Sequence, residues 1–214
     1  MALEINTERH SIGLLAIKPH AVRKPQVLAE IDRLIVELPP ELQIEDTDRE
    51  ILSAAYRGRL PAIEVSEGDE YLMMNYGDSV QEPFFEDLLR VYSGPTAIRL
   101  FETREVPQSE LDLALNALKG CVGIVLLCGG YARKPTGIRG LVVPDAHTRC
   151  ADCSCLPKEE TRQEGKLSSE SYATMLNNAV HATNSLEHDI DGIIRLLTAR
   201  LGERALKNLL ERTQ

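Results

Sequence analysis

Residues 11–38, SIGLLAIKPHAVRKPQVLAEIDRLIVEL, contain the two patterns that decide the fold class. Ser11 to Lys18 is a short and mostly apolar run, which is typical of a buried β-strand. After Pro25, which suits a first helical turn, apolar residues recur every three or four positions as far as Leu38. Pro39-Pro40 ends this amphipathic helix. A strand followed by such a helix opens an α/β or α+β domain.

Further elements are predicted on the C-terminal side. Thr96 to Glu102 alternates apolar and polar residues, as a half-buried strand does. Glu110 to Lys119 is predicted to be a helix that a capping-box variant, Ser109 with Asp112, opens and that Gly120 stops. Weaker patterns predict a strand in LQIED and a turn at Ser93-Gly94-Pro95. They also predict a helix in DREILSAAYRG, one helix on each side of residues 77–82, and helices over 186–197 and 203–212.

Length and composition restrict the class of protein. The 214 residues, 43% hydrophobic and 27% charged, fit one globular domain. A net charge of −9 argues against sequence-independent binding to nucleic acid, which needs a surplus of Lys and Arg. The longest apolar stretch, Cys121 to Cys128, is too short to span a membrane, and the N-terminus has no apolar signal region. We therefore expect a cytoplasmic protein with reduced thiols and no membrane partner.

Five short segments together resemble the nucleoside diphosphate kinase family. Taken singly, each fits an ordinary structural role as well as a functional one. In chain order they are Ala16-Ile17-Lys18-Pro19-His20-Ala21-Val22, Tyr76 with Glu82-Pro83-Phe84-Phe85, Ser93-Gly94-Pro95, Pro135-Thr136-Gly137-Ile138-Arg139-Gly140, and Asn178-Ala179-Val180-His181-Ala182-Thr183-Asn184-Ser185. They are similar to the family's IKPDAV, Tyr…PFF, SGP, PGTIRG and N-x-x-H-G-S-D-S segments, in the family's order.

The resemblance implies a fold and an assembly. The expected fold is an α+β ferredoxin-like sandwich, with a four-stranded antiparallel sheet, helices packed on it and a long cysteine-containing loop insertion. Residues 1–214 would form a single domain of this kind, with insertions at about 41–69 and 141–171 and a C-terminal helical extension at about 198–214. The family generally forms homo-oligomers, so a hexamer, tetramer or dimer is expected.

The resemblance also implies a reaction and a set of site residues. The γ-phosphoryl group of a nucleoside triphosphate, bound with Mg²⁺, passes to a nucleoside diphosphate through a phosphohistidine at His181. Histidine suits this task because it is partly neutral near pH 7. Lys18 and Arg139 match the family's phosphate-binding cations, and Tyr76 matches the tyrosine beside the histidine. The positions that bind the base and sugar are Phe84, Leu88 and Asn178, although Tyr76, Phe84 and Leu88 also fit a structural role in the core.

The sequence departs from the family pattern at several positions. His20 replaces an aspartate, and Thr183-Asn184 replaces Ser-Asp. The acid that orients the family's histidine falls at Gly192, with Asp189 or Asp191 as substitutes. The family's second phosphate-binding arginine has no clear counterpart, and Lys119 and Arg133 are the candidates for its place. These departures keep two alternatives open: an enzyme of this fold diverged to phosphoryl or nucleotidyl transfer onto a specialised acceptor, or a non-catalytic nucleotide-binding module.

The insertion at 141–171 holds a cluster of soft metal ligands. His147, Cys150, Cys153 and Cys155 lie within nine residues, and this spacing is compatible with Zn²⁺. A second pair of ligands, which structural zinc sites usually have, is absent from the segment. The odd number of cysteines, five, disfavours a disulfide framework. Reactive thiols or an ordinary surface loop are the other interpretations.

Overall fold

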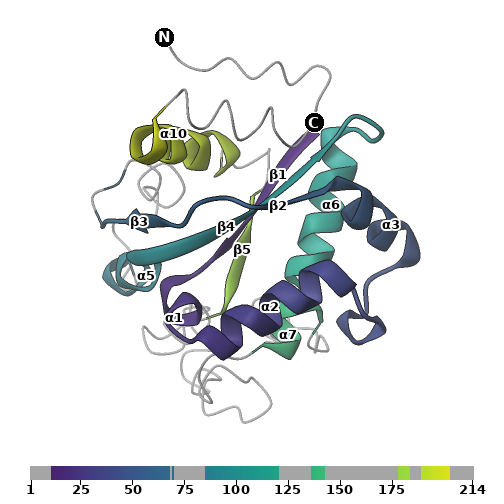
Figure 1. Ribbon diagram of the computed structural model, residues 1–214, viewed down its shortest axis with the longest axis horizontal. Helices are drawn as coiled ribbons and strands as arrows, with labels where there is room; N and C mark the ends of the chain where they lie inside the picture. The colour runs from purple at the N-terminus through teal and green to yellow at the C-terminus, as the bar shows by residue number, and fades with distance from the viewer. Residues whose placement is uncertain are drawn as a thin grey trace, which may run out of the picture.

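The chain forms an antiparallel sheet with helices on both faces in a computed structural model (Figure 1). The structure describes residues 11–67, 69, 85–120, 136–142, 178–183 and 189–202. The predicted helix at 203–212 and the cysteine-containing loop lie outside these ranges. All structural statements below refer to the described residues.

Four strands form the main path of the sheet. In chain order they are β1 (Ser11–Ile17), β2 (Tyr56–Arg59), β4 (Gly94–Thr103) and β5 (Val180–Ala182), and their spatial order is β2-β4-β1-β5. All neighbours are antiparallel. A short fifth strand, β3 (Ile63–Val65), pairs with the start of β4. With helices between β1 and β2 and between β4 and β5, this is the ferredoxin-like order. The α+β fold class predicted from the sequence is confirmed, with one strand more than expected.

The helices are of very different lengths. They are α1 (Pro19–Val22), α2 (Pro25–Glu37), α3 (Asp46–Ala55), α5 (Phe85–Tyr92), α6 (Gln108–Lys119), α7 (Gly137–Leu141) and α10 (Asp189–Leu201), with a 3-10 turn at Pro40–Leu42. Helices α2, α3, α5 and α6 connect strands, α10 follows the last described strand, and α1 and α7 are short.

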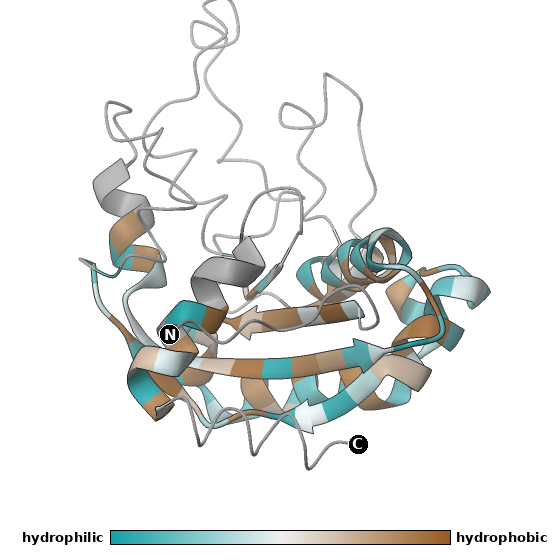
Figure 2. Ribbon diagram, turned by 90° about the horizontal axis from the view of Figure 1, so that it is seen from above, coloured by the Kyte–Doolittle hydropathy of each residue, from teal (hydrophilic) through white to brown (hydrophobic). Residues whose placement is uncertain are grey.

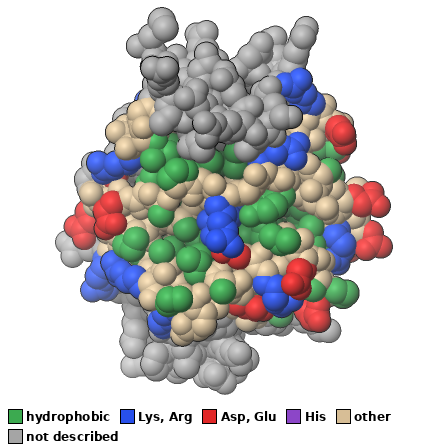
Figure 3. All heavy atoms as spheres, in the orientation of Figure 1, with side chains coloured by type: hydrophobic (Ala, Val, Ile, Leu, Met, Phe, Trp, Pro, Cys, Tyr) green, Lys and Arg blue, Asp and Glu red, His purple; other side chains and the backbone are tan. Residues whose placement is uncertain are grey.

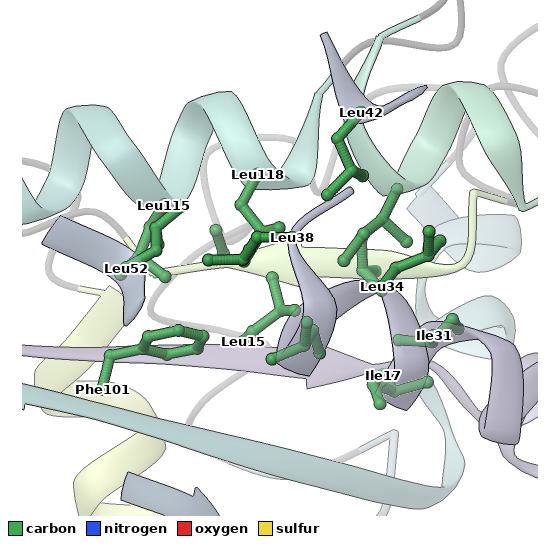
Figure 4. Packing of buried hydrophobic residues seen from close by; sticks show 14 of the residues in the cluster. Leu15, Ile17, Ile31, Leu34, Leu38, Leu42, Leu52, Phe101, Leu115 and Leu118 are labelled. Carbon is green, nitrogen blue, oxygen red and sulfur yellow. The ribbon is translucent and has the colours of Figure 1, made fainter. Parts of the chain in front are cut away.

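The larger hydrophobic core lies between the sheet and α2, α3 and α6. Leu15 and Ile17 of β1 and Phe101 of β4 face it, and Figure 4 shows them packed against Leu34 and Leu115 of the helices. Strand residues alternate between the two faces of a sheet, so Leu15 and Ile17 of the buried strand β1 join this core, while Leu14 and Ala16 face the other way. Truncation of one such leucine to alanine typically costs about 2–5 kcal/mol.

A second core covers the opposite face of the sheet. Leu14 and Ala16 of β1 and Leu100 of β4 point into it, and Leu197 of α10 and Tyr92 of α5 cover them. In Figure 1, α10 and α6 lie on opposite sides of the strands. Figure 2 shows the corresponding mixture along the helices, where brown and teal residues alternate, and brown stretches along several strands. Both faces of the sheet are therefore buried.

Three local predictions differ from the structure, one of them only in where the helix ends. LQIED forms no strand: Leu42 ends a 3-10 turn and the chain then enters α3 at Asp46. The predicted helix DREILSAAYRG stops at Ala55, because Tyr56 begins a strand that pairs with Phe101. The cap of α6 is Pro107 rather than Ser109, with no side-chain hydrogen bond.

The turn before β4 and the exposure of β4 also differ from expectation. Gly94 and Pro95 already belong to β4, so the turn predicted at these residues is short. The polar side chains of β4 were expected to face solvent, yet Arg99 is only 2% exposed. Arg99 is accommodated because its guanidinium Nε donates to Asp32 Oδ1 of α2 at 2.6 Å.

The surface carries charges of both signs. Figure 3 shows one face, on which blue and red side chains are interspersed with green hydrophobic ones. None of the helices in the described ranges combines the length and apolar character that a membrane span requires.

Candidate functional site

Lys18 lies directly at the end of β1 and is almost completely buried. Its backbone N–H donates to Ala179 O at 2.9 Å, which extends the pairing of β1 with β5 by one residue. Pro19 then starts α1, so the strand cannot continue. Only 1% of Lys18 is exposed. A lysine predicted from the sequence to bind phosphate is thus held by regular backbone structure at the edge of the core.

His181 lies beside Lys18 on the neighbouring strand. In the register of β1 and β5, Ala16 faces His181, and Ile17 faces Val180. Val180 and Ala182 point into the larger core, so the half-buried His181 side chain lies on the opposite face of the sheet. Strand pairing therefore brings together two residues that are far apart in the sequence.

Thr183 fixes the end of β5. Its hydroxyl Oγ1 accepts the Leu14 N–H at 2.8 Å, and its own N–H donates to Leu14 O at 2.9 Å. The hydroxyl is also 3.2 Å from Leu14 O. Thr183, which stands where the resemblance predicts a serine, thus anchors the strand that carries His181.

Tyr92, the last residue of α5, contacts both His181 and Lys18. Its hydroxyl is 3.5 Å from Nδ1 of His181, and the two rings meet edge to face with centroids 6.0 Å apart. The Lys18 ammonium lies 4.3 Å from the centroid of the Tyr92 ring, which is a cation–π contact. Sequence analysis missed Tyr92. The sequence feature that could have pointed to it is its position immediately before Ser93-Gly94-Pro95.

Two further cations complete the charge distribution. Arg139 in α7 is half-buried, and its Nε donates to Val180 O of β5 at 2.9 Å. Lys119, the last residue of α6, donates from Nζ to Asn116 Oδ1 at 2.6 Å. Burial lowers the pKa of the Lys18 ammonium well below its usual range, and the positive charges of Arg139 and Lys119 lower it further. We call Lys18, Tyr92, Lys119, Arg139 and His181 the histidine site.

A close contact between two glycines joins the elements that carry Lys119 and Arg139. Gly120 follows α6 with φ +70°, and Gly137 begins α7 with φ +60°. A Cβ on Gly120 would come within 1.9 Å of Thr136 O, and one on Gly137 within 2.6 Å of Gly120 Cα. The predicted helix stop at Gly120 is confirmed. The structure adds that both positions require glycine because the two backbones touch.

The remaining predicted site residues are placed only in part. Asn178 is buried and directly precedes Ala179, the residue that binds the Lys18 backbone. Leu88 belongs to α5, and Asp189, Asp191 and Gly192 belong to the first turn of α10. Outside the described residues lie Tyr76, Phe84, Arg133, His147, Cys150, Cys153 and Cys155. Their predicted roles, including the Zn²⁺ cluster, stay predictions.

The histidine site has the chemistry of an anion-binding site with a nucleophile. A buried ammonium and a guanidinium in surroundings of low dielectric constant attract a phosphate more strongly than they would in water. An imidazole nitrogen at the same place can attack phosphorus or transfer a proton. Within the described ranges, no group of three or more His, Cys, Asp or Glu side chains is arranged to hold a metal ion.

Comparison with known proteins gives similarity at the level of structure alone. No protein-family model and no curated protein sequence matches the chain. The fold is similar to the Aquifex aeolicus nucleoside diphosphate kinase, with 16% identity, a TM-score of 0.45, and 86% of this chain and 94% of that chain covered.

Two further solved structures are similar to a comparable extent. The Borrelia burgdorferi nucleoside diphosphate kinase, a transition-state mimic with vanadate and ADP, has 16% identity, a TM-score of 0.46, and coverage of 88% and 87%. The Halobacterium salinarum enzyme in complex with CDP has 12% identity, a TM-score of 0.39, and coverage of 81% and 77%. With identities this low, what the chain does must be inferred from its own residues.

Proposed function

We propose that this chain binds nucleotides at the histidine site and transfers the γ-phosphoryl group of a nucleoside triphosphate to a nucleoside diphosphate through His181. The observation that carries the proposal is the strand register that sets His181 opposite Ala16, two residues before the buried Lys18. Lys18 itself is bonded to Ala179, two residues before His181. A nucleophile and a buried cation are thereby held close together by backbone pairing. The motif resemblance supports the same assignment.

The proposed reaction has two displacement steps. A lone pair on an imidazole nitrogen of His181 forms a bond to the γ-phosphorus, and the bond between this phosphorus and the bridging oxygen breaks. The electron pair leaves with the nucleoside diphosphate. A second nucleoside diphosphate then attacks the phosphohistidine through a terminal oxygen of its own phosphate, and His181 is regenerated.

Lys18 and Arg139 supply charge for both steps. During phosphoryl transfer negative charge is spread over the equatorial oxygens, and catalysis depends mainly on cations that are already in position. Arg139 is fixed by its bond to Val180 O, next to His181 in the sequence. We propose that Asn178 contacts the sugar, and that Phe84 and Leu88 contact the base. Mg²⁺ enters bound to the nucleotide phosphates and neutralises part of their charge.

Labelling with γ-³²P-ATP and Mg²⁺ tests the proposal. The expected product is a protein-bound phosphate that is labile in acid and stable in base, with transfer to added nucleoside diphosphate. His181→Ala should abolish both, whereas the control His188→Ala, which lies outside the N-x-x-H motif, should be labelled like the parent. Lys18→Ala and Arg139→Ala should each lower the rate by a factor of roughly 10² or more.

Other outcomes of this experiment distinguish the alternative functions. Nucleotide binding without label or transfer would contradict the kinase and indicate a binding module. A nucleotidyl adduct, or release of pyrophosphate in the presence of another acceptor, would indicate a diverged transferase. We also propose a homo-oligomer, which light scattering at micromolar concentration tests, since a clean monomer would contradict it.

A further inference from the structure

Tyr92 bridges the two groups on which the proposed reaction depends. One side chain presents its ring face to the Lys18 ammonium at 4.3 Å and its hydroxyl to Nδ1 of His181 at 3.5 Å. The residue is 6% exposed, so water does not compete strongly for these contacts. A ring face and a hydroxyl act on different partners, and they can be removed separately by mutation.

The local structure places Tyr92 firmly. Ser93 closes the end of α5, with its N–H and hydroxyl both donating to Leu89 O, at 3.0 and 2.7 Å. Gly94 then takes φ +125°, a conformation that other residues rarely adopt, and the chain enters β4. A tyrosine that ends a helix and precedes a paired strand has little freedom to move.

Gly94 also explains why Lys18 can reach the ring. A Cβ at this position would lie 3.1 Å from Pro19 Cβ and 2.7 Å from the Arg23 guanidinium. The absence of a side chain lets α1 pack against the start of β4. Because Lys18 directly precedes Pro19, this approach sets the ammonium against Tyr92. The contact between Lys18 and Tyr92 therefore depends on the glycine at position 94.

We infer that Tyr92 is a positioning residue that holds the His181 imidazole through its hydroxyl and the Lys18 ammonium through its ring face. The inference rests on the proposed function, since it assigns a role at the same site. It differs from the sequence-based assignment, which gave the place beside the histidine to Tyr76. In Tyr92, the two contacts orient the nucleophile and the phosphate-binding cation relative to each other before nucleotide binds.

Two substitutions separate the two contacts. Tyr92→Phe keeps the ring and removes the hydroxyl, whereas Tyr92→Leu removes the aromatic face as well. The matched controls are Tyr56→Phe and Tyr56→Leu, because Tyr56 is a half-buried tyrosine on β2 that packs against Phe101 at a centroid distance of 5.4 Å. Circular dichroism and thermal melting of each variant show whether the fold is kept.

The decisive readout is NMR titration of the nucleotide-free protein, which does not depend on catalysis. In Tyr92→Phe the ring ¹⁵N shifts of His181 should change, because its Nδ1 loses the contact with the hydroxyl, while the Lys18 pKa stays at its parent value. In Tyr92→Leu the Lys18 pKa should fall by about half a unit to one unit, since the ammonium loses the ring face. The Tyr56 variants should leave both residues unchanged.

Either of two results overturns the inference: an unchanged His181 in Tyr92→Phe, or an unchanged Lys18 in Tyr92→Leu. Phosphorylation kinetics add a second readout. Tyr92→Phe should slow labelling of His181 about threefold with unchanged ATP affinity, whereas Tyr92→Leu should also weaken ATP binding. If no phosphohistidine forms in the parent protein, the proposed function fails, yet the titrations still decide whether Tyr92 holds the two groups.

Discussion

Two groups of charged residues lie against the same sheet and are built in opposite ways. In the first, the Asp32 cluster, the carboxylate of Asp32 on α2 forms ion pairs with two arginines. Oδ1 lies 2.6 Å from Nε of Arg99 on β4, and Oδ2 lies 3.0 Å from Nη2 of Arg59 on β2. In the second, the histidine site, the positive charges of Arg139 and Lys119 act on the buried ammonium of Lys18. The Asp32 cluster brings opposite charges together, whereas in the histidine site the described neighbours Arg139 and Lys119 carry the same charge as Lys18.

The difference fits two different roles: a structural one for the Asp32 cluster, and the binding role that we propose for the histidine site. Burial of charge is costly, and close pairing of opposite charges offsets most of that cost in the Asp32 cluster. Gathering cations around a buried ammonium raises the cost instead, and a protein retains such an arrangement where it binds an anion. The contrast therefore predicts opposite effects of mutation. Removing a charge from the Asp32 cluster should lower the free energy of unfolding of the protein, whereas removing one from the histidine site should raise it.

Removal of Asp32 should have the largest effect on stability. Asp32→Ala leaves the guanidinium of Arg99, whose side chain is 3% exposed, buried without its carboxylate partner. We expect the free energy of unfolding to fall by about 3–5 kcal/mol. Urea unfolding followed by circular dichroism measures the change. The control Glu30→Ala, on the same helix but in an exposed pair with Arg33, should unfold like the parent protein. Equal midpoints for the two variants would contradict the structural role of the cluster.

A side chain at the glycine contact should have the next largest effect. In Gly120→Ala the Cβ meets backbone Thr136 O, and the backbone also has a strained φ of +70°. We expect a loss of about 2–3 kcal/mol and weaker ATP binding, since Lys119 and Arg139 are displaced. Gly202→Ala is the matched control, because Gly202 follows α10 with φ +82° and its Cβ would meet nothing within 4 Å. Similar losses in both variants would show that φ alone, rather than contact with Thr136, requires the glycine.

Most residues of the histidine site were predictable from the sequence. Lys18, Arg139, Asn178 and His181 stood out in short motifs, and the apolar run that begins at Ser11 placed Lys18 at a strand end. Tyr92 was not predicted, because its contacts depend on how the chain turns at Gly94 and on the approach of α1. The turn signal at Ser93-Gly94-Pro95 indicates that the chain bends there, but it does not show that α1 packs against the start of β4 and brings Lys18 to the Tyr92 ring.

The Asp32 cluster could not be predicted by the same means. Asp32 lies on the apolar face of α2, and Arg99 lies in a strand whose alternation indicated an exposed polar face. The two residues are 67 positions apart, and only the packing of α2 on β4 shows that each neutralises the other. Periodicity indicates which face of an element is buried, but it does not show which buried polar residues are partners.

Replacement of Lys18 should have the smallest effect on stability, with the opposite sign. At neutral pH we expect Lys18→Met to raise the free energy of unfolding by about 1 kcal/mol, because the cost of burying a lysine is removed and outweighs the loss of its contacts, the cation–π contact with Tyr92 included. ATP affinity should fall. The result expected for a purely structural lysine is the reverse: lower stability with ATP affinity unchanged.

The difference in free energy of unfolding between Lys18→Met and the parent protein should depend on pH, because the pKa of Lys18 is lowered in the folded state. Below that pKa the lysine is charged in both folded and unfolded chains, so the full cost of its burial opposes folding. As pH rises from the lowered pKa towards about 10.4, the folded protein has lost a proton that the unfolded chain still binds, and stability rises. The advantage of Lys18→Met over the parent should therefore shrink as pH rises through this window. Urea unfolding of both proteins at several pH values measures it, and a constant difference would mean that Lys18 does not titrate there.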